Sequence, residues 1–147
     1  MVTNSSIDRA NRLCKDKKMH ANVTFKIVSW DENPFEEVGD GPKLTQAHVK
    51  RSFDGDLTGT GNLMYVMTHI DSGDASFVGY EKVVGALGGR SGSFVLRHTG
   101  YYDGGKATAE LEVVPGSGTD ELVGLSGTGR FSAGYAEEHD MPLDYEV

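Results

Sequence analysis

The sequence predicts an all-β protein, most simply an eight-stranded, mainly antiparallel up-and-down β-barrel of lipocalin-like form. Hydrophobic and polar residues alternate with a period of two along most of the chain, which is typical of strands with one buried face. The 20 glycines among the 147 residues recur between these segments, where tight turns need them. No segment predicts a helix long enough to cover a sheet, so closure into a barrel is the simplest way to remove exposed strand edges.

The length and charge of the chain restrict its class. A chain of 147 residues is typical of a single domain and buries a core without a metal or a disulfide. Its net charge of −8 disfavours nucleic acid and anionic membranes as partners. No apolar run is long enough for a membrane span or a signal peptide, and the single cysteine favours a reducing compartment. We therefore expect a soluble, cytoplasmic protein.

The barrel is expected to span residues 19–147 and to follow a polar, mobile extension over residues 1–18. The first strand begins at Ala21, and we expect it to end before Pro34, because proline has no N–H for the sheet ladder. Its expected core face consists of Val23, Phe25, Ile27 and Ser29.

The next two strands are joined at Asp54-Gly55, a pair that indicates a hairpin. The strand before this turn covers Leu44–Phe53, and the strand after it covers Asp56–Ile70. The expected core face of the earlier strand consists of Thr45, Ala47, Val49, Arg51 and Phe53. In the later strand, Gly59 and Gly61 indicate a bulge or a tight bend.

Three further strands follow, each after a glycine-containing turn. They cover Ala75–Leu87, Ser91–Gly100 and a segment ending near Val113. Their alternation places on shared faces Phe77, Gly79, Glu81 and Val83 in the fourth strand, Phe94, Leu96 and His98 in the fifth, and Ala107, Ala109 and Leu111 in the sixth.

The last part of the chain begins with a short helix that Thr119 caps and Gly124 ends. The seventh strand then covers Leu125–Ala133 and the eighth covers Met141–Val147. A two-sheet β-sandwich is the alternative architecture, because alternation alone does not distinguish it from a barrel.

Three segments of the chain are distinctive: Ser29–Phe35, Ala75–Leu96 and Val113–Leu125. Together they resemble a family of small bacterial proteins of unknown function that is grouped with the allene oxide cyclase-like barrels, and the similarity spans about Met19–Val147. The resemblance implies an eight-stranded barrel that self-associates, with a homodimer as the first expectation. It also implies a relation to plant allene oxide cyclases and dirigent-type barrels, which bind hydrophobic molecules and steer cyclisation, but it implies no established reaction.

Glu81 and His98 are the candidate catalytic residues. Glu81 interrupts an apolar strand face, where loss of hydration raises the pKa of a carboxyl toward that of a general acid or base. Arg51 is its candidate partner, in which case the ion pair fixes the register of the barrel; alternatively Arg51 reaches water at the mouth. His98 shares a face with apolar residues, and a purely structural hydrogen-bonded histidine is its alternative role.

Aromatic residues are the candidate ligand contacts, together with Arg51. Trp30 stands at the end of the first strand, where it would act as a lid over a ligand. The other candidates are Tyr65, Phe77, Phe94 and Phe131, whose alternative role is simply to fill the core. No cofactor is expected, and no metal site is predicted because the five histidines are dispersed.

The function that we expect is binding of a small, largely apolar molecule in the interior. The alternatives are an isomerase or cyclase that uses Glu81 as acid or base, and a non-catalytic structural homo-oligomer. An interior cavity of about 300 Å³ or more with convergent polar groups would favour binding or catalysis. A core filled by phenylalanines would favour the structural role.

Overall fold

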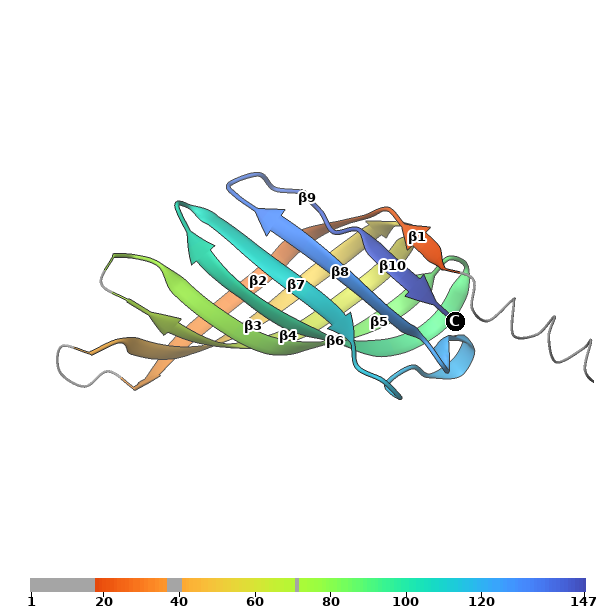
Figure 1. The fold of residues 1–147 in the computed structure, drawn as a ribbon, viewed down its shortest axis with the longest axis horizontal. Coiled ribbons are helices and arrows are strands. Elements are labelled where there is room, and N and C mark those ends of the chain that lie inside the picture. Colours follow the sequence, from red (N-terminus) through yellow and green to blue (C-terminus); the bar gives the residue numbers. More distant parts are fainter. Residues whose placement is uncertain (1–17, 37–40, 71) are drawn as a thin grey trace, which may run out of the picture.

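Ten antiparallel strands form one curled, barrel-like sheet in the computed structural model, which describes residues 18–36, 41–70 and 72–147 (Figure 1). The strands are β1 (Met19–Ala21), β2 (Val23–Glu36), β3 (Lys43–Gly55), β4 (Leu57–His69), β5 (Ala75–Leu87), β6 (Arg90–Asp103), β7 (Lys106–Val113), β8 (Ser126–Ala133), β9 (His139–Asp140) and β10 (Leu143–Glu146). Because all ten strands belong to one sheet, the two-sheet sandwich is wrong. Apart from Lys18, the predicted mobile extension lies outside the described residues.

The described part of the chain has ten strands rather than the expected eight, because β1 precedes the first expected strand except at Ala21 and β9 precedes the expected start of the eighth strand at Met141. Asn22 separates β1 from β2, while Met141 and Pro142 separate β9 from β10. β1 pairs with β10, and β2 pairs with β9, so the N-terminal segment lies beside the C-terminal segment. The sheet curls until the two ends of the chain meet, as Figure 1 shows for β1 and β10.

β2 continues through Pro34, where we expected it to end. Beyond Phe25, β2 pairs with β3 alone, because its pairing with β9 is limited to Thr24 and Phe25. This part of β2 is therefore an edge strand, which is the setting in which a sheet tolerates proline.

A bulge at Val28 changes which side chains of β2 face inward. Ile27 pairs with Arg51 and Ser29 with Lys50, so β2 carries one extra residue between these pairs. Ser29 is consequently not on the core face, contrary to the expected alternation. Of the bulge or tight bend predicted at Gly59 and Gly61, the bulge is absent, since β4 pairs in continuous register with both of its neighbours.

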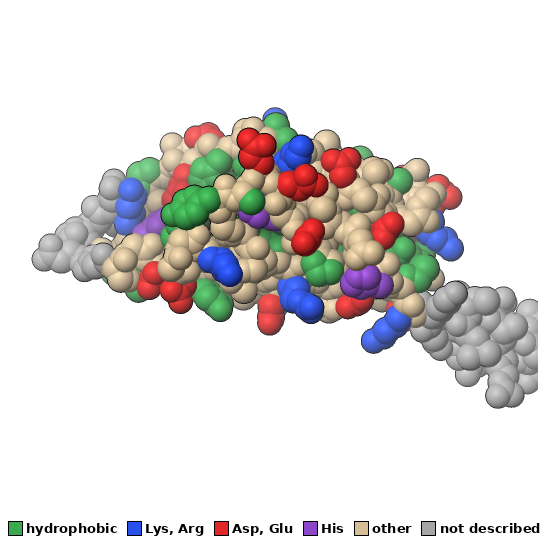
Figure 2. Space-filling model, turned by 90° about the horizontal axis from the view of Figure 1, so that it is seen from above, with side chains coloured by type: hydrophobic (Ala, Val, Ile, Leu, Met, Phe, Trp, Pro, Cys, Tyr) green, Lys and Arg blue, Asp and Glu red, His purple; other side chains and the backbone are tan. Residues whose placement is uncertain are grey.

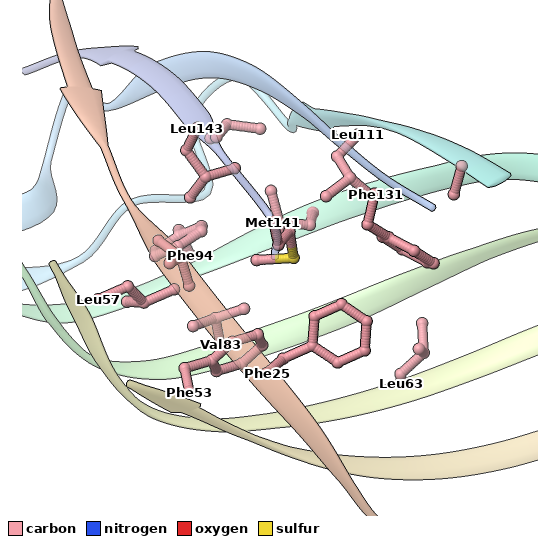
Figure 3. Packing of buried hydrophobic residues seen from close by; sticks show 14 of the residues in the cluster. Phe25, Phe53, Leu57, Leu63, Val83, Phe94, Leu111, Phe131, Met141 and Leu143 are labelled. Atoms are coloured by element: carbon pink, nitrogen blue, oxygen red, sulfur yellow. The ribbon is translucent and has the colours of Figure 1, made fainter. Parts of the chain in front are cut away.

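The predicted core faces of β3, β5 and β6 are confirmed. Every second residue along these strands is buried, including the polar residues Arg51, Glu81 and His98. Figure 3 shows the apolar side chains between the strands, with Phe25 and Phe131 among them. Their rings meet edge to face with centroids 5.1 Å apart. On the outside, acidic and basic side chains are interspersed over the face seen in Figure 2.

One end of the sheet is closed by packed side chains. Here η1 (Asp120–Leu122), a single 3₁₀ turn, packs against β6 and buries Leu122 completely. Thr119 is the N-cap residue of this turn, as predicted, but its side chain makes no capping hydrogen bond; its hydroxyl instead accepts a hydrogen bond from the Ser93 backbone N–H at 3.0 Å. No helix of the described residues has the length and apolar character needed to cross a membrane.

Candidate functional site

The opposite end of the sheet contains a cavity of about 370 Å³. Its walls include residues at or beside the β4–β5, β6–β7 and β8–β9 connections, namely Gly73, Tyr102, Ala107 and Gly134. The edge of β2 beyond Phe25, which β9 does not cover, runs along one side of it. The interior is therefore packed toward η1 and hollow toward the end formed by these three connections, which we call the hairpin end.

Five of the six predicted ligand contacts line this cavity: Trp30, Arg51, Tyr65, Phe77 and Phe131. Most of the remaining wall is also apolar and includes Ile27, Leu63 and Met67. Phe94 is completely buried in the packed part of the core, away from this wall. The geometry thus groups five of the six residues around one space, while their role in binding stays a prediction.

The bulge at Val28 determines the wall formed by β2. Before the bulge, Phe25 and Ile27 face the cavity, and after it Trp30 and Glu32 do. The Trp30 ring lies 6.1 Å from the Tyr65 ring, centroid to centroid, and remains 44% exposed. Trp30 is thus part of the wall near the opening, as its predicted place at the rim requires.

Arg51 and Glu81 form a bidentate ion pair beneath the cavity. The Nε of Arg51 donates to Oε2 of Glu81 at 2.7 Å, and its Nη2 donates to Oε1 at 2.5 Å. Both side chains are buried, with 2% and 0% exposure. The guanidinium also lies over the Phe25 ring, 4.3 Å from its centroid. Arg51 is therefore paired in the interior, and the alternative in which it reaches water at the mouth is wrong.

This pairing reverses the pKa shift that the sequence suggested for Glu81. Burial by itself raises the pKa of the carboxyl, but the charge of Arg51 and hydrogen bonds from His98 and Arg51 lower it to about 2. Glu81 is consequently a carboxylate at neutral pH. Besides Arg51, the His98 imidazole also contacts this carboxylate: its Nε2 donates to Oε1 at 3.0 Å.

His98 connects the ion pair to Tyr65, whose hydroxyl lies 2.9 Å from His98 Nδ1. Burial lowers the pKa of His98, and the nearby Arg51 charge adds to this effect, so the imidazole is neutral at pH 7. With its proton on Nε2 toward Glu81, His98 accepts from the Tyr65 hydroxyl through Nδ1. The result is a buried chain of four polar side chains: Arg51, Glu81, His98 and Tyr65.

Gly61 makes room for the Glu81 carboxylate. A Cβ at this position would clash with Glu81 Oε2 and approach the Phe53 ring. This explains the glycine in the middle of β4, where the sequence suggested a bend.

Neither candidate catalytic residue reaches the cavity itself. Glu81 and His98 have 0% exposure and are absent from its wall. Arg51 and Tyr65 stand between them and the cavity. Both line the cavity wall, and Arg51 hydrogen-bonds Glu81 while Tyr65 hydrogen-bonds His98. Glu81 and His98 are placed to orient Arg51 and Tyr65, and any catalytic role for them stays a prediction.

A second polar cluster lies in the cavity wall near the opening, and the sequence analysis missed it. Glu32 Oε2 accepts hydrogen bonds from the Thr45 hydroxyl and from His69 Nε2, both at 2.8 Å. Glu32 Oε1 accepts from Trp30 Nε1 at 3.0 Å. Burial opposes ionisation, but these donors together lower the pKa of Glu32, so it is ionised at neutral pH.

One half of this cluster could have been identified from the sequence. His69 continues the inward alternation of Leu63, Tyr65 and Met67 along β4. Glu32 could not have been identified, because the bulge at Val28 shifts the alternation by one residue.

The ion pair leads to a prediction about stability. We expect Glu81→Gln to lower the free energy of unfolding by about 3–5 kcal/mol, because Arg51 is left as an uncompensated buried charge. The matched control is Glu110→Gln, which changes an exposed carboxylate opposite Arg130 and should cost at most about 1 kcal/mol.

The double variant Arg51→Met/Glu81→Gln should recover part of the loss, because it removes both charges. Urea unfolding of the four proteins measures these differences. Equal stability of Glu81→Gln and Glu110→Gln would contradict the importance of the pair.

The lowered pKa of His98 leads to a prediction about pH. The unfolded chain takes up a proton at the ordinary histidine pKa of 6.5, whereas the folded protein does so only at lower pH. The contribution of the neutral His98 side chain to the free energy of unfolding is therefore fully present above about pH 6.5. It is lost as the pH falls toward the lowered pKa of the folded protein. Glu81 adds a second loss lower down, between its ordinary pKa of 4.5 and about 2.

Urea unfolding between about pH 7.5 and pH 5 tests this expectation. The free energy of unfolding should fall with pH more steeply in the natural protein than in His98→Gln. His20, whose pKa is raised by its hydrogen bond to Asp144, contributes with the opposite sign in both proteins and cancels in the difference. Identical slopes would show that His98 is not held neutral by burial.

Comparison with known proteins identifies the family. Residues 21–145 match the model of the family described as protein of unknown function, DUF3224. The chain is also similar to the crystal structure of a protein with unknown function from the DUF3224 family of Shewanella oneidensis MR-1. The two share 30% sequence identity and a TM-score of 0.66, over 88% of this chain and 97% of the other. No curated protein matches the chain. The chain therefore belongs to the DUF3224 family.

Proposed function

We propose that this protein binds a small, largely apolar molecule in the cavity at the hairpin end of its sheet. The observation that carries the proposal is the cavity of about 370 Å³, whose wall is mostly apolar and contains a few polar groups. Cavities of roughly 300–1,000 Å³ with this composition are typical of small-molecule sites.

The charges around the cavity favour an uncharged ligand. The positive charge of Arg51 is already compensated by Glu81, and the negative charge of Glu32 is held by three hydrogen-bond donors. Neither group needs a counter-ion from a ligand. The Tyr65 and Trp30 side chains offer aromatic surfaces in the cavity wall. An apolar ring or chain with one or two oxygen atoms therefore fits this wall best.

The strand pairing supports a finer description of the fold. If β1 with β2 and β9 with β10 are each counted as one interrupted strand, the sheet is an eight-stranded up-and-down barrel. This reading agrees with a relation to the allene oxide cyclase-like barrels. Such a relation would support a hydrophobic ligand, but it does not specify a reaction.

Catalysis by Glu81 is the less favoured alternative. Its carboxylate is completely buried and held by Arg51 and His98, and its pKa of about 2 leaves it a weak base. A reaction would therefore have to use the groups that reach the cavity.

Filling the cavity should abolish binding. Ala75 lies in the wall, so Ala75→Phe places a ring in the cavity, whereas Ser76→Phe places the same ring on the outer face. Trp30 is the single tryptophan of the chain, so its fluorescence reports on the cavity. Titration with N-phenyl-1-naphthylamine, an uncharged apolar probe, should quench it in the natural protein and in Ser76→Phe, but not in Ala75→Phe.

Native mass spectrometry of the protein from its host should in addition reveal a co-purified molecule that Ala75→Phe lacks. Equal quenching in all three proteins would show that the probe binds elsewhere. Absence of both quenching and a co-purified molecule in the natural protein would contradict the proposed function.

We also propose that the protein forms a homodimer through the outer face of β4 and β5. Met64 lies opposite Tyr80, and Val66 lies opposite Val78, and all four side chains are between 42% and 58% exposed. Contiguous exposed apolar residues of this kind are typical of interaction surfaces, and a two-fold axis would bring identical patches together.

Replacing Val78 by lysine should convert the dimer into a monomer, because the charge would have to be buried without a partner. Ser76→Lys, two residues earlier on the same face, is the control and should remain dimeric. Sedimentation velocity over a range of protein concentrations distinguishes these states. A natural protein that stays monomeric throughout would refute the dimer.

A further inference from the structure

Glu32 and His69 form a carboxylate–imidazole pair in the wall of the cavity. They come from different strands, β2 and β4, and Glu32 Oε2 lies 2.8 Å from His69 Nε2. Their side chains are 26% and 33% exposed, in contrast to the completely buried Glu81 and His98. A molecule in the cavity can therefore reach this pair directly.

The hydrogen bonds of Glu32 determine which nitrogen of His69 carries the proton. Glu32 is ionised, so it only accepts hydrogen bonds, and Nε2 of His69 must be the donor. In the neutral imidazole, the lone pair is consequently on Nδ1. Nδ1 makes no hydrogen bond to any residue that the structure describes. His69 thus has an orienting carboxylate on one nitrogen and an available base on the other.

Other polar groups around His69 keep this arrangement in place. The Thr45 hydroxyl lies 3.2 Å from His69 Nε2 and donates to Glu32 at 2.8 Å, and Trp30 Nε1 holds the other oxygen of Glu32. Lys43 is the cross-strand neighbour of His69 on β3. The Trp30 ring lies against that of Tyr65, so the pair touches the buried network of Arg51 and Glu81 through a ring contact.

We propose that His69 is the general base of a proton-transfer site in this cavity and that Glu32 is its positioning residue. The substrate class is a small, largely apolar molecule with a C–H bond made acidic by an adjacent carbonyl or similar electron-withdrawing group. The inference rests on the proposed function, because it places the substrate in the same cavity.

The reaction that follows is an isomerisation. Nδ1 of His69 takes the proton, and the electron pair of the broken C–H bond moves into the adjacent carbonyl to give an enolate. In a substrate with a C=C double bond next to that carbon, the enolate extends over the double bond as a dienolate, and the imidazolium returns the proton to the far carbon of this bond, so that the double bond moves into conjugation with the carbonyl. Atoms and electrons balance without an oxidant, a reductant or a second substrate.

The test uses 5-nitrobenzisoxazole, a small aromatic compound that reports on a base in an apolar cavity. The base removes the C–H proton of the isoxazole ring, the C–H electrons form a nitrile, and the N–O bond breaks to release a coloured phenolate. The natural protein should accelerate this elimination, and His69→Gln should lower the rate by about 10²–10⁴-fold, which is the usual contribution of a general base.

His20→Gln is the matched control. It removes an imidazole that is also paired with a carboxylate, Asp144, at 2.7 Å, but that lies on the surface outside the cavity. Its rate should equal that of the natural protein. If His20→Gln and His69→Gln retain equal activity, His69 is not the base.

The decisive part of a second measurement uses the natural protein alone. The ¹⁵N chemical shifts of the His69 ring in the natural protein at alkaline pH should show a proton on Nε2 and none on Nδ1. In Glu32→Gln, the share of the other tautomer should rise and the elimination should slow. A proton on Nδ1 of the natural protein would overturn the proposal.

Trp30 fluorescence separates failure of this inference from failure of the proposed function. Quenching by 5-nitrobenzisoxazole without elimination would leave binding intact and overturn the general base. Absence of both quenching and elimination would overturn the general base together with binding in this cavity. Quenching with elimination that is lost in His69→Gln supports both.

Discussion

Arg51 and Glu81 bring two full charges into the interior of a small sheet, where neither has access to water. Such a pair is costly to bury and still more costly to break, so the strands that carry it cannot shift relative to one another. β3 supplies Arg51, β5 supplies Glu81, and β4 contributes Gly61, whose missing side chain leaves space for the carboxylate. A one-residue slip of β3 or β5 would turn Arg51 or Glu81 outward and leave its partner unpaired.

The ion pair of Arg51 and Glu81 lies between two regions of the interior that differ in packing. On the side of η1, leucine and phenylalanine side chains fill the space completely, as Leu57, Leu122 and Phe94 do. On the other side the walls remain apart and leave a cavity, with Tyr65 at the boundary and its hydroxyl held by His98. The packed core and the cavity thus lie at opposite ends of one sheet.

The two polar clusters differ in what they can do. In the buried cluster, Glu81 is a permanently ionised counter-ion, and His98 is held neutral by burial. In the cluster near the opening, Glu32 orients an imidazole that remains accessible from the cavity. Burial strengthens the first cluster as a scaffold and prevents it from exchanging protons, whereas partial exposure leaves the second available for chemistry.

The sequence by itself determined the all-β class and the inward faces of β3, β5 and β6, because alternation with a period of two follows directly from strand geometry and placed Arg51, Glu81 and His98 correctly in the interior. It could not determine the sign of the pKa shift of Glu81, since that depends on a partner 30 residues away. Only the tertiary structure decided the bulge at Val28 and hence the meeting of Glu32 with His69. A bulge depends on the pairing between two strands, and no pattern within one strand records it.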